Sequence, residues 1–169
     1  MAALQWIPEL NTGIPEIDRQ HRRICDYINQ LDEIRHTHDR EKLSTVIAEV
    51  VDYTMSHFAF EEGLMEDAGY AFAAPHKRVH ELVTRRVSEL KARFDKGEDV
   101  AEELHSLLSR WLFNHIRNDD RGYVEAAQVF LRMSAGWQTS QRNKMEAQAR
   151  ETSTDGRRKR GWLARIFGG

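Results

Sequence analysis

Apolar residues recur at helical spacing along most of the chain after residue 16, and no segment shows the sustained alternation of a strand. Four long stripes and one shorter segment follow this spacing: residues 21–31, 43–64, 76–94, 100–115 and 124–133. The connections between them are short, which favours antiparallel neighbours. The pattern therefore predicts an all-α, up-down-up-down four-helix bundle, with an extended N-terminal arm and a short fifth helix that extends or follows the fourth.

The residues between the stripes predict where the helices begin and end. Asp39 is placed to cap the second helix. Gly69 and Pro75 separate the second helix from the third, with the proline opening the third. Asp99 and Glu102 form a capping-box-like start for the fourth helix.

Composition narrows the class of protein. The 169 residues, 40% hydrophobic and 31% charged, fit one globular domain. The single cysteine, Cys25, excludes an intramolecular disulfide and any cysteine-based zinc site, and we expect it to be a buried structural thiol. No apolar run approaches the roughly 20 residues that span a bilayer, and no secretory signal is recognisable, so we expect a cytoplasmic protein.

The net charge of −2 is unevenly distributed along the chain. Residues 151–169 carry five basic and two acidic side chains, so the preceding residues are acidic as a whole. An acidic body argues against nucleic acid as a partner, because phosphate contacts need a basic face.

The chain divides into three predicted parts: a bundle at 1–137, a polar linker at 138–156 and a flexible basic tail at 157–169. Placed on a helix, the large apolar residues of the tail fall on one side, after a basic cluster: Trp162, Leu163, Ile166 and Phe167. This pattern is typical of a short anchor for an anionic surface such as the inner membrane. A docking peptide for a protein partner fits it equally well, and a disordered solubilising end is the third interpretation.

Five histidines fall in phase with the buried stripes: His21, His57, His76, His80 and His115. A single such residue is best read as a hydrogen-bonded core histidine. All five, however, lie near the start of an odd-numbered helix or near the end of an even-numbered one. In an up-down-up-down bundle these positions share one end, so the sequence predicts that the imidazoles converge on one layer.

Carboxylates in the same region favour a metal centre. Glu61 follows His57 by four residues and so projects from the same helix face. Its burial among imidazoles would be costly without a cation. Five imidazoles with one or two carboxylates exceed the needs of one zinc ion, which favours two metals, and the mixed ligand set favours iron. Ideal helical phase would add Asp119 to the layer, whereas Asp120 requires a local bulge, and spacing leaves both open.

Four runs carry these residues: GIPEIDRQH ending at His21, HFAFE at 57–61, HKRVH at 76–80 and WLFNHIRNDD at 111–120; Trp6 lies in the N-terminal arm. Together these motifs resemble those of the single-domain bacterial hemerythrins. The resemblance covers about residues 5–135, and this chain has a matching residue at all seven metal-ligand positions of that family.

The resemblance implies two non-heme iron ions bridged by an oxo or hydroxo group and by Glu61 and Asp120. It assigns His76, His80 and His115 to one iron, and His21 and His57 to the other, which keeps an open position for dioxygen. It also implies an apolar oxygen pocket lined by Ile24, Phe58, Trp111, Leu112, Ile116 and Tyr123. In this way the resemblance selects Asp120 over Asp119.

The remaining polar residues are expected at the surface. His36 and His38 flank the first turn, and His105 lies off the main stripe of its helix, so we expect all three to be exposed. Glu62 and Asp119 are most simply surface charges.

Three classes of function compete. The first is a non-enzymatic protein that binds dioxygen for carriage, storage or sensing, which the histidine-rich ligand set favours. The second is a di-iron enzyme that handles peroxide or nitric oxide. The third is an oxygen-responsive signalling adaptor that acts through the basic tail.

Overall fold

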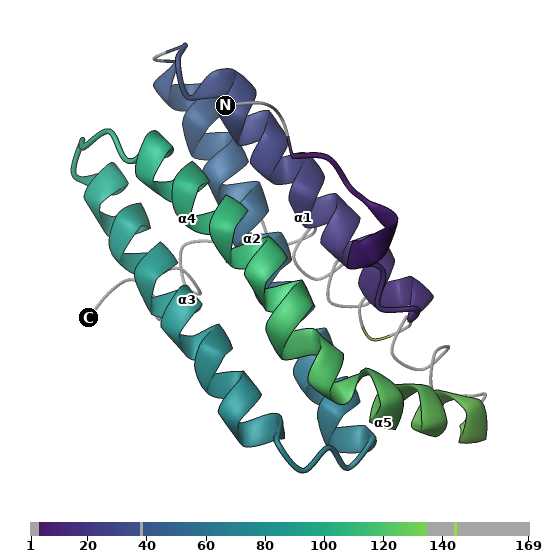
Figure 1. The fold of residues 1–169 in the computed structure, drawn as a ribbon. Helices are drawn as coiled ribbons and strands as arrows, with labels where there is room; N and C mark the ends of the chain where they lie inside the picture. Colours follow the sequence, from purple (N-terminus) through teal and green to yellow (C-terminus); the bar gives the residue numbers. More distant parts are fainter. Residues whose placement is uncertain (1–3, 38, 135–143, 145–169) are drawn as a thin grey trace.

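The computed structural model describes residues 4–37, 39–134 and 144. A short 3₁₀ turn, η1 (Pro8–Leu10), precedes the helices in the arm. The remaining elements are α1 (Pro15–Ile34), α2 (Arg40–Asp67), α3 (Ala73–Asp95), α4 (Ala101–Asn114), the π-helical segment η2 (His115–Asp120) and α5 (Arg121–Met133). The predicted all-α bundle is confirmed (Figure 1).

The four long helices form a closed antiparallel ring. Helix α1 packs against α2 and α4, and α3 packs against the same two helices from the other side. Helix α5 follows α4 through η2, runs at an angle to α4 and covers the end of α2 (Figure 1). The start of α1 and the end of α2 are thereby brought next to the start of α3 and the end of α4.

The apolar interior consists of two clusters. The main core cluster runs through α1 to α4 and includes Ile24, Phe58, Leu112 and Ile116. The end cluster lies toward α5 and consists of Ile14, Ile17, Phe60, Leu64, Met65, Tyr123 and Ala127. Along α1, His21 falls between Ile17 of the end cluster and Ile24 of the main core cluster. A buried polar layer therefore separates the two clusters.

The predicted helix ends are partly right. The Asp39 side chain accepts a hydrogen bond from the Lys42 backbone N–H at 3.1 Å, which confirms the predicted cap of α2. Pro75 is the third residue of α3 rather than its opening residue. The predicted capping box at α4 is wrong: Asp99 accepts from the Ala101 backbone N–H, and Glu102 pairs with the buried guanidinium of Arg35, the residue that follows α1. A cross-helix ion pair thus replaces the local cap.

The π-helical segment η2 changes which side chains face the interior. In an ideal α-helix, Asp119 would follow His115 on the same face, four residues on. The wider turn of η2 instead brings Asp120 into the core, with its side chain fully buried, while the side chain of Asp119 is 33% exposed. The local bulge that Asp120 requires is therefore present.

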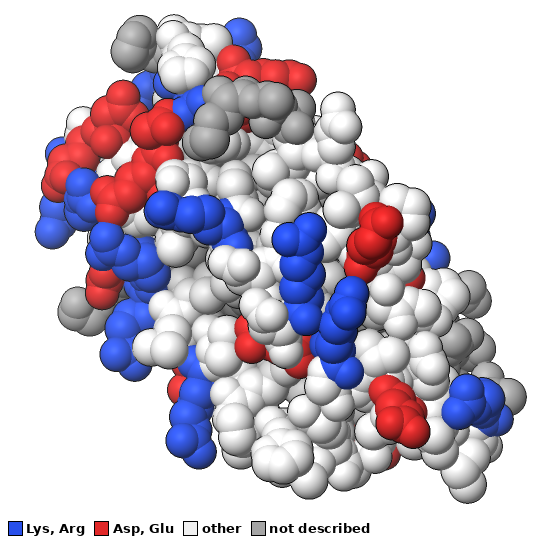
Figure 2. Space-filling view, in the orientation of Figure 1, with Lys and Arg blue, Asp and Glu red and all other residues white. Residues whose placement is uncertain are grey.

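Charged side chains of both signs are interspersed on the face of the molecule shown in Figure 2. Ion pairs also join neighbouring helices: Arg86 and Arg93 of α3 both pair with Glu103 of α4, at 2.6 and 2.8 Å. Among the described residues, no helix combines the length and apolar character of a bilayer-spanning segment. The tail at 157–169, with its predicted anchor residues, lies outside the described residues, as does the linker at 138–156 apart from Lys144.

Cys25 is a buried thiol, as predicted, and we expect it to be unreactive in the folded protein. Burial, with a smaller contribution from Asp26, raises the pKa of the thiol to about 11. At pH 8 the reactive thiolate is therefore about 100-fold scarcer than for an ordinary exposed cysteine. A thiol reagent should label the native protein slowly and the denatured protein at once, whereas equally fast labelling of both would contradict the buried position.

Candidate metal centre

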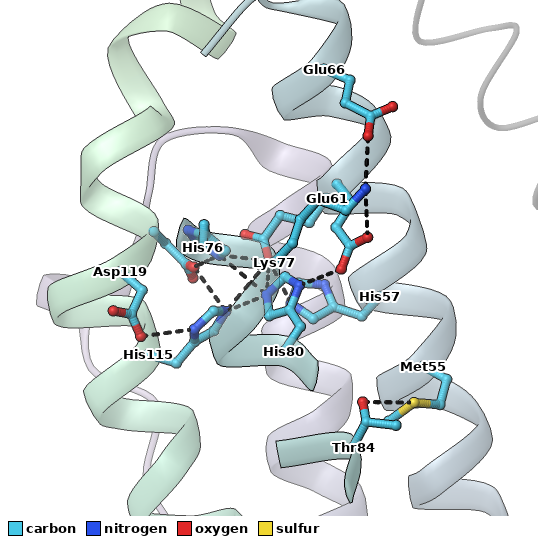
Figure 3. Close-up of polar contacts among 12 residues, drawn as sticks. Met55, His57, Glu61, Glu66, His76, Lys77, His80, Thr84, His115 and Asp119 are labelled. Atoms are coloured by element: carbon cyan, nitrogen blue, oxygen red, sulfur yellow. Dashed lines mark hydrogen bonds and ion pairs between the residues drawn. The ribbon is translucent and has the colours of Figure 1, made fainter. Parts of the chain in front are cut away.

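Seven side chains from four segments of the chain meet in the polar layer between the two apolar clusters. All seven are buried: His21, His57, Glu61, His76, His80, His115 and Asp120. They come from α1, α2, α3 and η2, and Figure 3 shows the imidazoles of α2, α3 and η2 turned toward one another. The structure thus brings together all seven positions that the sequence singles out.

One part of the layer gathers three histidines around Glu61. The Nε2 atom of His80 lies 3.1 Å from Nε2 of His76 and 3.4 Å from Nε2 of His115. Glu61 Oε2 lies 3.2 Å from His80 Nε2, 3.4 Å from His115 Nε2 and 3.6 Å from His76 Nε2. These four side chains form one group of ligand atoms able to hold a cation.

The other part pairs His21 with His57, whose ring centroids are 4.7 Å apart, and again includes Glu61. Glu61 Oε2 is 3.7 Å from His57 Nε2, so the same carboxylate reaches both groups. Asp120 also reaches both sides: Oδ2 lies 3.2 Å from His21 Nε2, and Oδ1 lies 2.9 Å from His115 Nε2. Two carboxylates therefore stand between a three-histidine group and a two-histidine group.

The spacing of these atoms fits metal ligation. The Nδ1 atoms of His80 and His115 face carboxylates. When these neutral rings donate outward through Nδ1–H, their Nε2 lone pairs face one another. Lone pairs at this distance repel unless a cation lies between them. Two nitrogens that each lie about 2.1 Å from one ion, at about 90–110°, are about 3.0–3.4 Å apart. The buried Nε2 atoms of His21 and His57 also lack a hydrogen-bond partner in the described part of the chain. A metal would satisfy both groups.

The electrostatics of the layer keep Glu61 ionised. Burial by itself would raise the pKa of Glu61, but the surrounding imidazoles, led by His57, outweigh it and hold this pKa well below the usual value. Tyr123 responds in the opposite direction: burial and the charge of Glu61 raise its pKa well above the usual value. The phenol therefore stays protonated and donates a hydrogen bond to Glu61 Oε1, which leaves Oε2 facing the histidines.

Two acidic residues that the sequence predicts to be surface charges lie against buried histidines instead. Glu62 Oε1 lies 2.9 Å from His80 Nδ1. Asp119 Oδ2 lies 3.2 Å from His115 Nδ1 (Figure 3). The prediction for both was wrong because each carboxylate is only partly exposed and accepts from a buried imidazole. For Asp119 the spacing of four residues from His115 was an available signal, whereas the contact of Glu62 with His80 joins two helices.

The prediction that His105 is exposed is also wrong. It is 4% exposed rather than at the surface, because the α1–α4 contact covers it. Its Nε2 atom lies 3.5 Å from Asp32 Oδ1 on α1, and burial lowers its pKa. It precedes His115 by ten residues, about 15 Å along a helix, so it stands apart from the polar layer. His36 is exposed as expected, and His38 lies outside the described residues.

The six predicted pocket residues are all buried. The Phe58 ring stacks on His80 with centroids 4.0 Å apart, and Trp111 stacks on His115 at 5.0 Å. Ile24, Leu112 and Ile116 belong with them to the main core cluster. Tyr123 belongs to the end cluster and touches the layer from the opposite side.

Comparisons with known proteins agree on one family. The family model described as the hemerythrin HHE cation binding domain matches residues 12–127. A bacteriohemerythrin of Pseudomonas aeruginosa (strain LESB58) is 60% identical over 126 residues, which are 75% of this chain and 82% of that protein. A bacteriohemerythrin of Stenotrophomonas maltophilia is 52% identical over 143 residues, covering 81% of this chain and 94% of that protein. A crystal structure of wild-type hemerythrin superimposes with a TM-score of 0.72 at 30% identity, covering 75% of this chain and 98% of that one.

Proposed function

Because this chain belongs to the hemerythrin family, we propose that it binds dioxygen reversibly at a centre of two non-heme iron ions. The family supports the coarser statement, that of a non-heme iron protein that binds oxygen and is not primarily an enzyme. The proposal of a two-iron centre rests on one observation: two buried groups of metal-ligand atoms share Glu61. A carboxylate shared by two donor groups suits a pair of adjacent metals, whereas a single metal requires only one group.

In this proposal His76, His80 and His115 hold one iron, and His21 and His57 hold the other. Glu61 and Asp120 would be shared by the two ions. The contacts of both carboxylates with both histidine groups support this shared role. The two-histidine group offers fewer protein ligands, so dioxygen would bind on that side.

The bound iron pair would supply the electrons that dioxygen takes up on binding. The residues of the chain supply the surroundings. Phe58 and Trp111 cover the imidazoles of His80 and His115 and keep water from them. Tyr123 fixes the orientation of Glu61 through its hydrogen bond. An apolar pocket excludes the water and protons that would make oxygen uptake irreversible.

A cycle of oxygen exposure and removal tests this function. Iron-loaded protein is reduced without oxygen, exposed to oxygen and then deoxygenated, while its visible absorption is recorded. Reversible binding predicts a spectrum that appears with oxygen and disappears when oxygen is removed. A peroxide- or nitric-oxide-handling enzyme would instead consume its substrate and leave an oxidised centre that deoxygenation does not reverse.

We expect Leu112→Ala to shorten the lifetime of the oxygen-dependent spectrum. Leu112 is fully buried beside Trp111, and its truncation opens a cavity through which water reaches the pocket. The change should also cost about 2–5 kcal/mol of stability. Leu108→Ala is the matched control, because Leu108 is equally buried one turn earlier on α4. Equal decay rates in the two folded, iron-loaded variants would contradict a pocket at Leu112.

We further propose that the tail is a targeting element with no part in the iron chemistry, because the family match ends at residue 127. Removing residues 156–169 should leave the oxygen-dependent spectrum unchanged and abolish localisation or partner capture. A changed spectrum would contradict the separation of the two parts.

Binding to anionic vesicles distinguishes a tail that anchors to a membrane from one that docks on a protein partner. Each basic residue near such a surface contributes about 1 kcal/mol, and salt screens the attraction. Binding that is lost at high salt and in Trp162→Glu would identify a membrane anchor. Absence of binding at low salt would exclude the membrane anchor and leave the protein partner.

A further inference from the structure

The outer nitrogens of the histidines do not have equivalent partners. In the three-histidine group, two Nδ1 atoms face carboxylates. His80 Nδ1 lies 2.9 Å from Glu62 Oε1, and His115 Nδ1 lies 3.2 Å from Asp119 Oδ2. Each of these imidazoles therefore donates to a group that carries a negative charge.

The outer nitrogens of the two-histidine group, by contrast, face no carboxylate in the part of the chain that the structure describes. His57 Nδ1 lies 3.0 Å from the amide oxygen Oε1 of Gln20, and both residues are buried. The Nδ1 atom of His21 has no hydrogen-bond partner in the described part of the chain. No carboxylate among the described residues contacts an outer nitrogen of this pair.

Glu62 is held in place rather than free to rotate into solvent. While Oε1 faces His80, Oε2 lies 3.4 Å from Lys77 Nζ on α3. The same ammonium group pairs with Glu66 at 2.8 Å, one turn further along α2 (Figure 3). Lys77 thus fixes the carboxylate against the imidazole from the solvent side.

A carboxylate on the outer nitrogen of a metal-binding histidine fixes its tautomer and ring orientation and makes the inner nitrogen a stronger donor. A neutral amide orients the ring but polarises it less. We propose that Glu62 and Asp119 are positioning residues that make the three-histidine position the tighter of the two metal positions, while Gln20 leaves the two-histidine position the weaker. This inference rests on the two-metal centre proposed above.

Anaerobic titration of the metal-free full chain with Co²⁺ tests the inference, because Co²⁺ bound to imidazole gives a visible spectrum and its binding can be followed in steps. We expect two binding steps, the tighter of which is lost in His76→Ala. Glu62→Gln and Asp119→Asn should each weaken that same step by about 10- to 100-fold and shift its spectrum. The weaker step should stay within about twofold of its wild-type affinity.

Two further variants separate positioning from folding and from general charge. Like Glu62, Glu66 lies on α2 and pairs with Lys77, so Glu66→Gln removes an equivalent negative charge. Because Glu66 touches no imidazole, this variant should leave both binding steps unchanged. Gln20→Glu places a carboxylate on His57 and should strengthen the weaker step. Equal effects of Glu62→Gln and Glu66→Gln would overturn the inference, as would a loss of both steps in Glu62→Gln with unchanged thermal stability. Failure of the wild-type chain to bind two Co²⁺ ions would instead overturn the two-metal centre itself.

Discussion

Replacing Glu61 by alanine is expected to reduce the iron content from two tightly bound ions per chain to one or fewer. Glu61 belongs to both groups of ligand atoms, so its loss removes a ligand from each. It also removes the negative charge that screens the repulsion between two adjacent cations. The chain should then retain at most one iron, in the three-histidine group.

The loss of Glu61 has a structural consequence that must be separated from metal binding. The buried hydroxyl of Tyr123 would lose its acceptor, at a cost of about 1–3 kcal/mol. Glu61→Gln keeps an acceptor for Tyr123 but removes the charge, so iron analysis of this folded variant isolates the ligand effect. Glu66→Ala, on the exposed side of α2, is the control for helix composition. Two tightly bound irons in Glu61→Ala would show that this residue is not the bridge.

Asp120→Ala should likewise disrupt the iron pair, and Asp119→Ala should not. Asp120 is fully buried and reaches His21 and His115 from within the layer, whereas Asp119 touches only the outer nitrogen of His115. We therefore expect Asp120→Ala to lose at least one iron and Asp119→Ala to keep two, with an affinity lower by about 10- to 100-fold at one position. Iron analysis after dialysis against a weak chelator measures both.

The reverse result would reassign the second bridging carboxylate. An unaffected Asp120→Ala together with loss of iron in Asp119→Ala would mean that the π-helical segment η2 does not determine the ligand. The pair is a matched comparison, because both variants remove one carboxylate from adjacent positions of η2.

Much of the bundle follows from the sequence because burial in a helix has a simple period. Stripes of apolar residues predicted four long helices, and the short connections predicted their antiparallel order, which the structure confirms. The same topology predicted that histidines at the ends of different helices meet, since these ends share one side of the bundle. The convergence of the five histidines could therefore be predicted from helix direction and phase alone.

What the sequence could not supply are the contacts that depend on packing between helices. The pairing of Glu62 with His80 joins α2 to α3, and that of Arg35 with Glu102 joins α1 to α4. The burial of His105 depends on α1 covering its side of α4. Helical phase favoured Asp119 over Asp120, and only the resemblance to a family selected the residue that η2 buries. Local spacing fails where a π-helical turn changes the phase.

The most direct test of the account is the amount of dioxygen that the reduced, iron-loaded chain takes up and releases. Because the two donor groups share one carboxylate, the account predicts about one dioxygen for every two irons. The same amount should be recovered on deoxygenation and taken up again over repeated cycles. Uptake that continues beyond this amount, or dioxygen that is consumed and not recovered, would contradict reversible binding at a di-iron centre.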